Sequence, residues 1–185
     1  EANNFWVLRE NDTGVKYPAT VSTVKETGDA NDWTTPGNVG ADDAAYASIT
    51  ASTFDNPDLS YLLKATNFST GVPAGATING ILVEIERYCD SGERCNDYDV
   101  CLTKDGSARV GDDKSTGAIF NVGSVTTVSF GGAADLWGTT WSQAEVTATT
   151  FGVLYKMQAT DANADGYVDF IRVTVYYTAG TAWTK

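Results

Sequence analysis

Short runs in which apolar and polar residues alternate constrain the fold of this chain more than any other feature. In Ala76–Tyr88, for example, Val83 and Ile85 alternate with Glu84 and Glu86. Successive side chains of a β-strand point to opposite faces, so a period of two predicts a strand with one buried face. Similar runs predict strands at Asp97–Thr103, Phe151–Gln158 and Phe170–Tyr177, and weaker patterns do so at Val21–Val24, Ala45–Ala51, Tyr61–Phe68, Ala118–Val122 and Val125–Phe130.

One stretch, Trp141–Thr149, has a helical pattern instead. Ser142 stands near its start and Glu145 falls in the first turn, which is the arrangement of a helix cap. Short strands separated by Gly, Pro and Asp turns are typical of a sandwich. We therefore predict an all-β fold, a single jelly-roll-like β-sandwich with an extended N-terminal arm and one short helix.

The ends of the chain divide it into three parts. Regular patterning predicts a β-sandwich domain at residues 17–178, preceded by an arm at 1–16 and followed by a tail at 179–185. The arm contains the apolar cluster Phe5, Trp6, Val7 and Leu8, which would promote aggregation unless other residues bury it. Two interpretations stay open, a first strand of the chain's own sheet or an arm that adds a strand to a neighbouring subunit.

Charge and composition exclude several function classes. The chain has 24 acidic and 12 basic residues, a formal net charge of −12, and no histidine. Phosphate neutralisation needs clustered Lys and Arg, so we expect no nucleic-acid partner. The commonest catalytic base and every His-dependent triad are ruled out. A hydrolase with two carboxylates remains an alternative, but no nucleophile with a matching base is evident, and we predict a protein that is not an enzyme.

The location of the protein is inferred from its beginning and its hydropathy. The sequence opens at Glu1 without an initiator Met, which a processed secreted protein explains, as does a trimmed piece of a longer chain. No run is long enough to cross a bilayer, so we expect no membrane insertion. An extracellular or cell-surface location is the expectation, with a virion as the alternative.

Three cysteines, Cys89, Cys95 and Cys101, lie close together in the sequence. A zinc site would need a fourth Cys or a His, so a disulfide with one leftover thiol is favoured. We predict a Cys89–Cys95 disulfide, while Cys95–Cys101 stays open. The thiol of Cys101 would then be free, or would bridge to another subunit. The acidic residues around the cysteines, Asp90, Glu93, Asp97 and Asp99, are interpreted as a solvated turn rather than a cation site.

The sharpest local motif is an acidic segment near the C-terminus. Its oxygen-bearing residues are Asp161, Asn163, Asp165, Tyr167 and Asp169, with Gly166 at the sixth position. This spacing matches the front of a calcium loop, so Ca²⁺ is the candidate cofactor. Position twelve is Arg172 instead of Glu, so the motif is not an EF-hand. The competing interpretation is a plain acidic hairpin turn closed by Asp165 and Gly166.

Two further patterns concern sugars. Asn11 and Asn67 fit the acceptor motif for N-glycosylation. Trp33, Trp137 and Trp141 are candidates for a platform that stacks on a sugar, although core packing is the more usual fate of such residues.

The body of the chain, from Tyr17 to Thr178, resembles a β-sandwich module found in phage and virion structural proteins and in microbial surface proteins. The residues that carry the resemblance are Asn79–Arg87 after the turn Val72–Ala76, then Phe130–Gly138, and finally Val168–Thr178. The resemblance implies a structural or adhesive role without catalytic residues. The chain departs from the module at the Cys89–Cys95 insertion, at Asp161–Asp169 and in its N-terminal arm.

Together these observations predict a structural subunit that self-assembles into an extracellular filament or surface assembly. The arm would add a strand to the next copy, so the partners would be further copies of this chain. The alternatives are a virion component, such as a head-decoration or tail protein, and a carbohydrate-binding module with a glycan partner.

Overall fold

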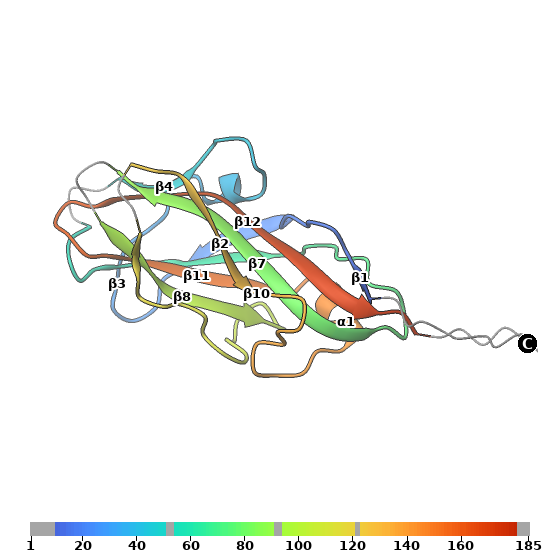
Figure 1. Ribbon diagram of the computed structural model, residues 1–185. Helices are drawn as coiled ribbons and strands as arrows, with labels where there is room; N and C mark the ends of the chain where they lie inside the picture. Colours follow the sequence, from blue (N-terminus) through green and yellow to red (C-terminus); the bar gives the residue numbers. More distant parts are fainter. Residues whose placement is uncertain (1–9, 51–53, 91–93, 121–122, 181–185) are drawn as a thin grey trace, which may run out of the picture.

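A computed structural model describes residues 10–50, 54–90, 94–120 and 123–180, and within them the chain forms two β-sheets packed face to face. Figure 1 shows the sandwich as an elongated body. The predicted all-β sandwich is confirmed. No helix among the described residues is long and apolar enough to span a membrane.

Sheet A is built around two long neighbouring strands. Its described strands are β1 (Glu10–Asp12), β4 (Ala47–Thr50), β7 (Thr77–Cys89), β10 (Thr126–Gly131) and β12 (Asp165–Thr178). The order is β1-β12-β7-β10. β4 pairs with the same edge of β12 as β1 does, but at the opposite end of that strand. All of these pairings are antiparallel.

Sheet B is built around β11 (Gly152–Ala159), which pairs with β8 (Cys95–Thr103) along its whole length. The other described strands are β2 (Thr20–Val24), β3 (Asp29–Asn31), β5 (Leu59–Ser60), β6 (Leu62–Thr66) and β9 (Ile119–Phe120). The order is β2-β6-β11-β5-β3, with β9 beyond β8. The β3–β5 pair is parallel.

The predicted helix forms as α1 (Gln143–Thr147) and has the cap that the sequence indicates. The Ser142 side chain accepts a hydrogen bond from the backbone N–H of Glu145, and the Glu145 carboxylate accepts one from the Ser142 backbone. These two bonds satisfy donors that a helix start otherwise leaves unpaired. A short 3-10 helix, η1 (Pro36–Val39), precedes β4.

The core lies between the two sheets and follows the alternation in the sequence. Ile81, Val83 and Ile85 on β7 are fully buried, while Glu84 and Glu86 between them face outward. Each buried aliphatic side chain of this size contributes about 1.5–3 kcal/mol relative to exposure. Trp33, Trp137 and Trp141 are also buried, so the tryptophans form core instead of the sugar platform considered above.

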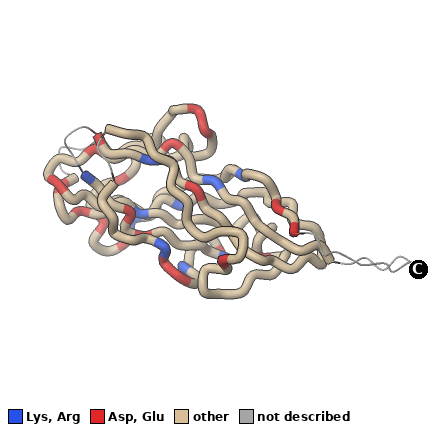
Figure 2. The backbone as a smooth tube through the Cα atoms, viewed as in Figure 1, with Lys and Arg blue, Asp and Glu red and all other residues tan. Residues whose placement is uncertain are grey.

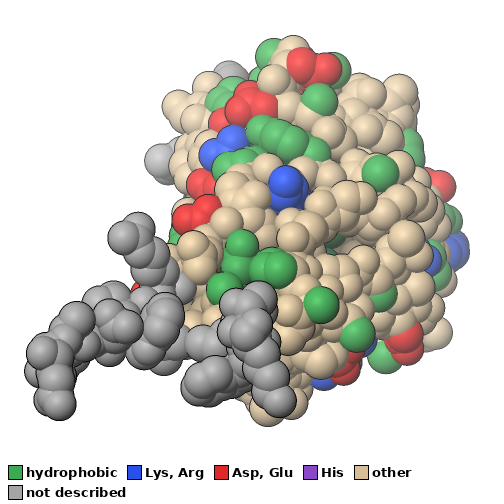
Figure 3. All heavy atoms as spheres, turned by 90° about the vertical axis from the view of Figure 1, so that its right-hand side faces the viewer, with side chains coloured by type: hydrophobic (Ala, Val, Ile, Leu, Met, Phe, Trp, Pro, Cys, Tyr) green, Lys and Arg blue, Asp and Glu red, His purple; other side chains and the backbone are tan. Residues whose placement is uncertain are grey.

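The described part of the predicted arm pairs within its own chain. Residues 10–12 form β1 against Tyr176–Thr178, and Lys16 bridges to Val173. Both ends of the described chain therefore meet at one end of the sandwich (Figure 1). The apolar cluster Phe5–Leu8 lies outside the described residues. On the described part of this end, hydrophobic side chains occur in small groups between polar ones (Figure 3).

The acidic segment between β11 and β12 differs from the hairpin considered as its alternative. Asp165 and Gly166 begin β12 instead of forming the turn, and the left-handed residue is Asn163, with φ 55°. Because β11 belongs to sheet B and β12 to sheet A, the segment 160–164 crosses between sheets. Backbone bonds from Asn56 to Asp161 and from Ala164 to Phe54 hold it in place.

Candidate functional site

A cleft of about 400 Å³ opens between β10 of sheet A and the chain that follows β8 in sheet B. Its polar lining residues are Arg87, Asp97, Lys114, Thr116 and Ser129. Val128, Phe130 and Ala118 supply apolar surface beside them. The cleft thus combines apolar walls with a few polar groups, which is the usual composition of a small-ligand site.

A buried ion pair forms the floor of this cleft. Arg87 on β7 donates two hydrogen bonds to the Asp97 carboxylate on β8, at 2.9 Å from Nε and 2.5 Å from Nη2. The hydroxyl of Tyr155 donates a third bond to Asp97, at 2.8 Å. The pair joins sheet A to sheet B, and the Phe120 ring lies 4.1 Å from the Arg87 guanidinium carbon.

One guanidinium nitrogen of Arg87, in the floor of the cleft, lacks a hydrogen-bond acceptor among the described residues. Nη1 of Arg87 is buried and has no hydrogen-bond partner among the residues that the structure describes. Burial tends to lower the pKa of Arg87, but the hydrogen bonds that it donates to Asp97 and the negative charge of that carboxylate act with Tyr155 to outweigh burial, so the pKa is raised and the guanidinium stays charged. A buried charged donor without a partner is costly, and a ligand acceptor in the cleft would relieve that cost.

The rim of the cleft carries a second positive charge. Lys114 contacts Asp135 at 2.9 Å and Asp112 at 3.6 Å, and its Nζ lies 5.7 Å from the Trp137 ring centre. The hydrogen bond to Asp135 raises the pKa of Lys114. A backbone bond from Lys114 to Val100 fixes this segment beside β8.

A second group of polar residues lies on the outer face of sheet A. Ligand oxygens of Asp42, Glu86 and Asp169 all lie within 4.8 Å of one another. Asp169 occupies a bulge in β12, between Val168 and Phe170, which turns its side chain toward the loop 40–46. Burial raises the pKa of Asp169, and the charges of Glu86 and Asp42 raise it further. The backbone N–H groups of Ala44 and Asp43 act in the opposite direction and lower this pKa.

Three tyrosines form a patch beside this acidic group. The rings of Tyr88 and Tyr167, opposite each other on β7 and β12, stack at 4.5 Å, and Tyr46 meets both rings edge-on. All three are partly exposed. Burial raises the pKa of Tyr46, and so do the charges of Asp169 and Glu86.

The residues of the predicted calcium loop are spread over several environments. The Asp161 carboxylate binds Arg94, and the backbone N–H of Asn163 donates to Asp55. Tyr167 belongs to the tyrosine patch, and Asp169 belongs to the acidic group with Asp42 and Glu86. The calcium loop itself stays a prediction.

The cysteines take the predicted arrangement. Cys89 and Cys95 form a disulfide, and Cys101 is free and buried against Leu62 and Leu154. Burial raises the pKa of the Cys101 thiol, as does its hydrogen bond with Asp99, so it stays protonated. Asp97 and Asp99 are buried in ion pairs with Arg87 and Arg109, which corrects the interpretation of these two acids as a solvated turn.

Two predicted glycosylation residues are partly exposed. Asn11 lies in β1, opposite Tyr177 on the sheet edge. Asn67 follows β6 in a left-handed conformation, and its backbone oxygen accepts a bond from Ala19.

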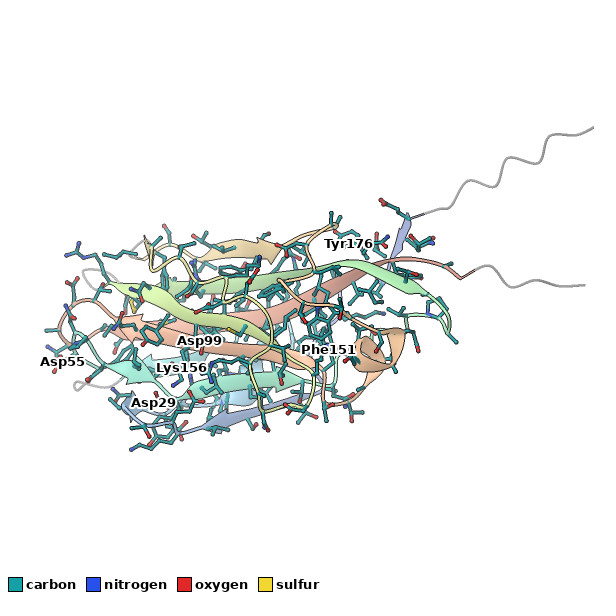
Figure 4. All side chains as sticks on the ribbon, turned by 90° about the horizontal axis from the view of Figure 1, so that it is seen from below. Asp29, Asp55, Asp99, Phe151, Lys156 and Tyr176 are labelled. Carbon is teal, nitrogen blue, oxygen red and sulfur yellow. A yellow bond between two sulfur atoms is a disulfide. The ribbon has the colours of Figure 1, made fainter. Side chains whose placement is uncertain are left out.

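Polar residues on sheet B form a further network, with a structural role. Lys156 on β11 is buried and contacts the carboxylates of Asp29 and Glu26. Figure 4 shows Lys156 and Asp29 side by side. Arg109 links Glu26 to Asp99, so the charges in this network are paired with one another.

No family model and no curated protein matches the chain in sequence. Among solved structures, it resembles the carbohydrate-binding module TmCBM61, solved in complex with β-1,4-galactotriose. The two chains are 11% identical over 89% of this chain and 86% of the other, with a TM-score of 0.37. A likeness this distant does not carry a ligand from one chain to the other.

Proposed function

We propose that this chain is a non-catalytic carbohydrate-binding module whose cleft between β8 and β10 holds a sugar. The unsatisfied Nη1 of buried Arg87, in the residue pair that forms the cleft floor, is the observation that carries the proposal. A sugar hydroxyl both accepts and donates hydrogen bonds. It can therefore accept from a guanidinium while another hydroxyl donates to a carboxylate or to Ser129.

The walls of the cleft suit the rest of a sugar ring. Val128 and Phe130 offer apolar surface for the C–H face of the ring, and Thr116 and Ser129 offer hydroxyls to its edge. The volume of about 400 Å³ falls in the range of small-ligand pockets. Arg87 and Asp97 are pre-organised by their mutual bonds, so little ordering is needed on binding.

The charges of the lining indicate the kind of sugar. Arg87 and Lys114 carry positive charge, and Asp97 is the one acidic residue among those lining the cleft. Arg87 is paired with Asp97, and Lys114 is paired with Asp135 and Asp112, so both positive charges of the lining are already neutralised. A neutral sugar therefore fits this arrangement better than an acidic one.

A glycan array followed by calorimetry tests the proposal. We expect binding to glycans with neutral sugars, lost in Ala118→Trp, which fills the exposed mouth of the cleft without touching the core. The matched control is Ala108→Trp, at another exposed alanine that does not line the cleft, and this variant should bind normally. An array without binding, or equal binding by both variants, would overturn the proposal.

The earlier expectation of self-assembly rests on Phe5–Leu8 and stays a prediction, as does the virion alternative. An extracellular location fits the Cys89–Cys95 disulfide, because such bonds persist in oxidising compartments.

A further inference from the structure

Three carboxylates from distant parts of the chain converge on the outer face of sheet A. Asp42 comes from the loop 40–46, Glu86 from β7 and Asp169 from the bulge in β12. The loop is held over β12 by a bridge between Gly40 and Phe170. Figure 2 shows the acidic stretch of this loop at the top of the molecule.

The buried member of the group lacks a partner on one side. Asp169 is 1% exposed, its Oδ2 accepts a bond from the Ala44 backbone at 3.3 Å, and its Oδ1 has no hydrogen-bond partner among the described residues. A buried carboxylate oxygen is normally paired or bound to a cation. Its nearest charged neighbours in the group are two further carboxylates, which repel it.

Arg172 forms an ion pair with one member of the group, Asp42, and a closer one with Glu84 outside the group. It contacts Asp42 at 3.4 Å, while its closest ion pair is with Glu84, at 3.0 Å. Glu86 receives a hydrogen bond from the Thr127 hydroxyl. Within the described part of the chain, Glu86 and Asp169 form no ion pair with a Lys or Arg, since Arg172 is shared between Glu84 and Asp42.

We propose that Asp42, Glu86 and Asp169 bind a divalent cation, and that the cation is Ca²⁺. Oxygens bound to one Ca²⁺ at 2.3–2.6 Å lie at most about 5 Å apart, which the observed 4.8 Å limit satisfies. All three side chains offer oxygen, the ligand of a hard cation, and none offers the nitrogen or sulfur that zinc prefers. Because Asp42 is exposed, the remaining positions are open to water.

The bound ion would tie the loop 40–46 to both long strands of sheet A. It would also lie beside the loop that carries Tyr46, whose ring belongs to the tyrosine patch. This site is separate from the glycan cleft, since none of its three residues lines that cleft. A negative result for one proposal therefore does not count against the other.

Terbium luminescence provides a direct test, because a nearby tyrosine sensitises Tb³⁺ emission. We expect emission from the full chain under tyrosine excitation, displaced by Ca²⁺, and a melting temperature several degrees higher in Ca²⁺ than in chelator. Glu86→Gln should weaken Ca²⁺ competition at least tenfold while keeping an oxygen for Thr127. Asp42→Asn, at an exposed position where we expect the fold to stay intact, should weaken it as well.

Two variants serve as controls. Asp43→Asn removes a neighbouring charge of the same loop outside the group and should bind as the wild type does. Asp165→Asn alters the predicted calcium loop but not this group, and should also bind normally. An unchanged melting temperature together with no emission at millimolar Ca²⁺ or Tb³⁺ would overturn the proposal. Normal binding by Glu86→Gln and Asp42→Asn would overturn it too. So would a loss of binding in Asp165→Asn instead of in these two variants.

Discussion

At the scale of single residues, Arg87 shows how a charge is kept inside a β-sandwich. It is 4% exposed, yet its guanidinium is bonded twice to Asp97 and packed on Phe120. Removing two charges from water costs several kcal/mol per ion, so such a pair persists only with good geometry. Tyr155 adds a bond to the same carboxylate, and burial keeps the pKa of its hydroxyl well above the usual range.

Breaking this pair should therefore destabilise the chain strongly. Arg87→Met leaves the Asp97 carboxylate buried without its cation, and we expect a loss of about 3–5 kcal/mol in the free energy of unfolding. Urea denaturation followed by tryptophan fluorescence measures the change. Arg94→Met is the control, because Arg94 pairs with Asp161 in an exposed position and should matter little. Equal effects of the two variants would contradict the structural role of the buried pair.

At the scale of elements, a charged network joins the loop after β2 to the strands of sheet B. Glu26 in that loop contacts Arg109 and also Lys156 on β11. The hydrogen bond from Arg109 lowers the pKa of Glu26 from its usual 4.5 to about 2, with burial acting in the opposite direction and Lys156 lowering it further. The network thus fixes the loop through an ionised carboxylate.

This shift predicts a pH dependence with a definite sign. A carboxyl group whose pKa is lower in the folded state stabilises the fold above its unfolded pKa, and that contribution is lost as pH falls toward the folded value. Glu26 should therefore contribute fully above pH 4.5 and lose its contribution down to pH about 2. Unfolding curves of the wild type and Glu26→Gln across this window test the point. We expect the difference between them to shrink with falling pH; a constant difference would show that Glu26 does not act through its charge.

The elements also show what the sequence could predict. Long strands such as β7 and β12 carry enough alternation to be found, and Ser142 with Glu145 marks the helix start. The short strands β3 and β5 escape prediction, because two or three residues carry no period.

Most of the residues that form the two candidate sites could not be predicted from the sequence to lie together. The cleft gathers Arg87, Asp97, Lys114 and Ser129 across two sheets, and no local pattern joins them. Asp169 was singled out as a metal ligand, but its partners Asp42 and Glu86 depend on a bulge and on strand register. The adjacent acids Asp42 and Asp43 in a loop after Gly40 are the signal that could have drawn attention to the second site.

At the scale of the whole molecule, the two sheets are linked where the chain passes from β7 to β8. The Cys89–Cys95 disulfide closes this crossing, and the Arg87–Asp97 pair lies two residues further inside on each strand. The cleft shares its floor with that pair, so the same contacts that hold the sheets together also hold the cleft residues in place.

The disulfide should therefore contribute to the stability of the sandwich as a whole. Its sequence separation of 6 closes a short loop, and restricting the unfolded chain by such a loop stabilises the fold by about 2 kcal/mol. We expect the double variant Cys89→Ala with Cys95→Ala to lose at least that much in urea denaturation. Cys101→Ala measures the packing cost of one buried sulfur without a disulfide, so the double variant should lose more than twice as much as Cys101→Ala. A loss no larger than twice that value would mean that the sheets are held by packing and by the Arg87–Asp97 pair, and that the disulfide adds nothing beyond its buried sulfur atoms.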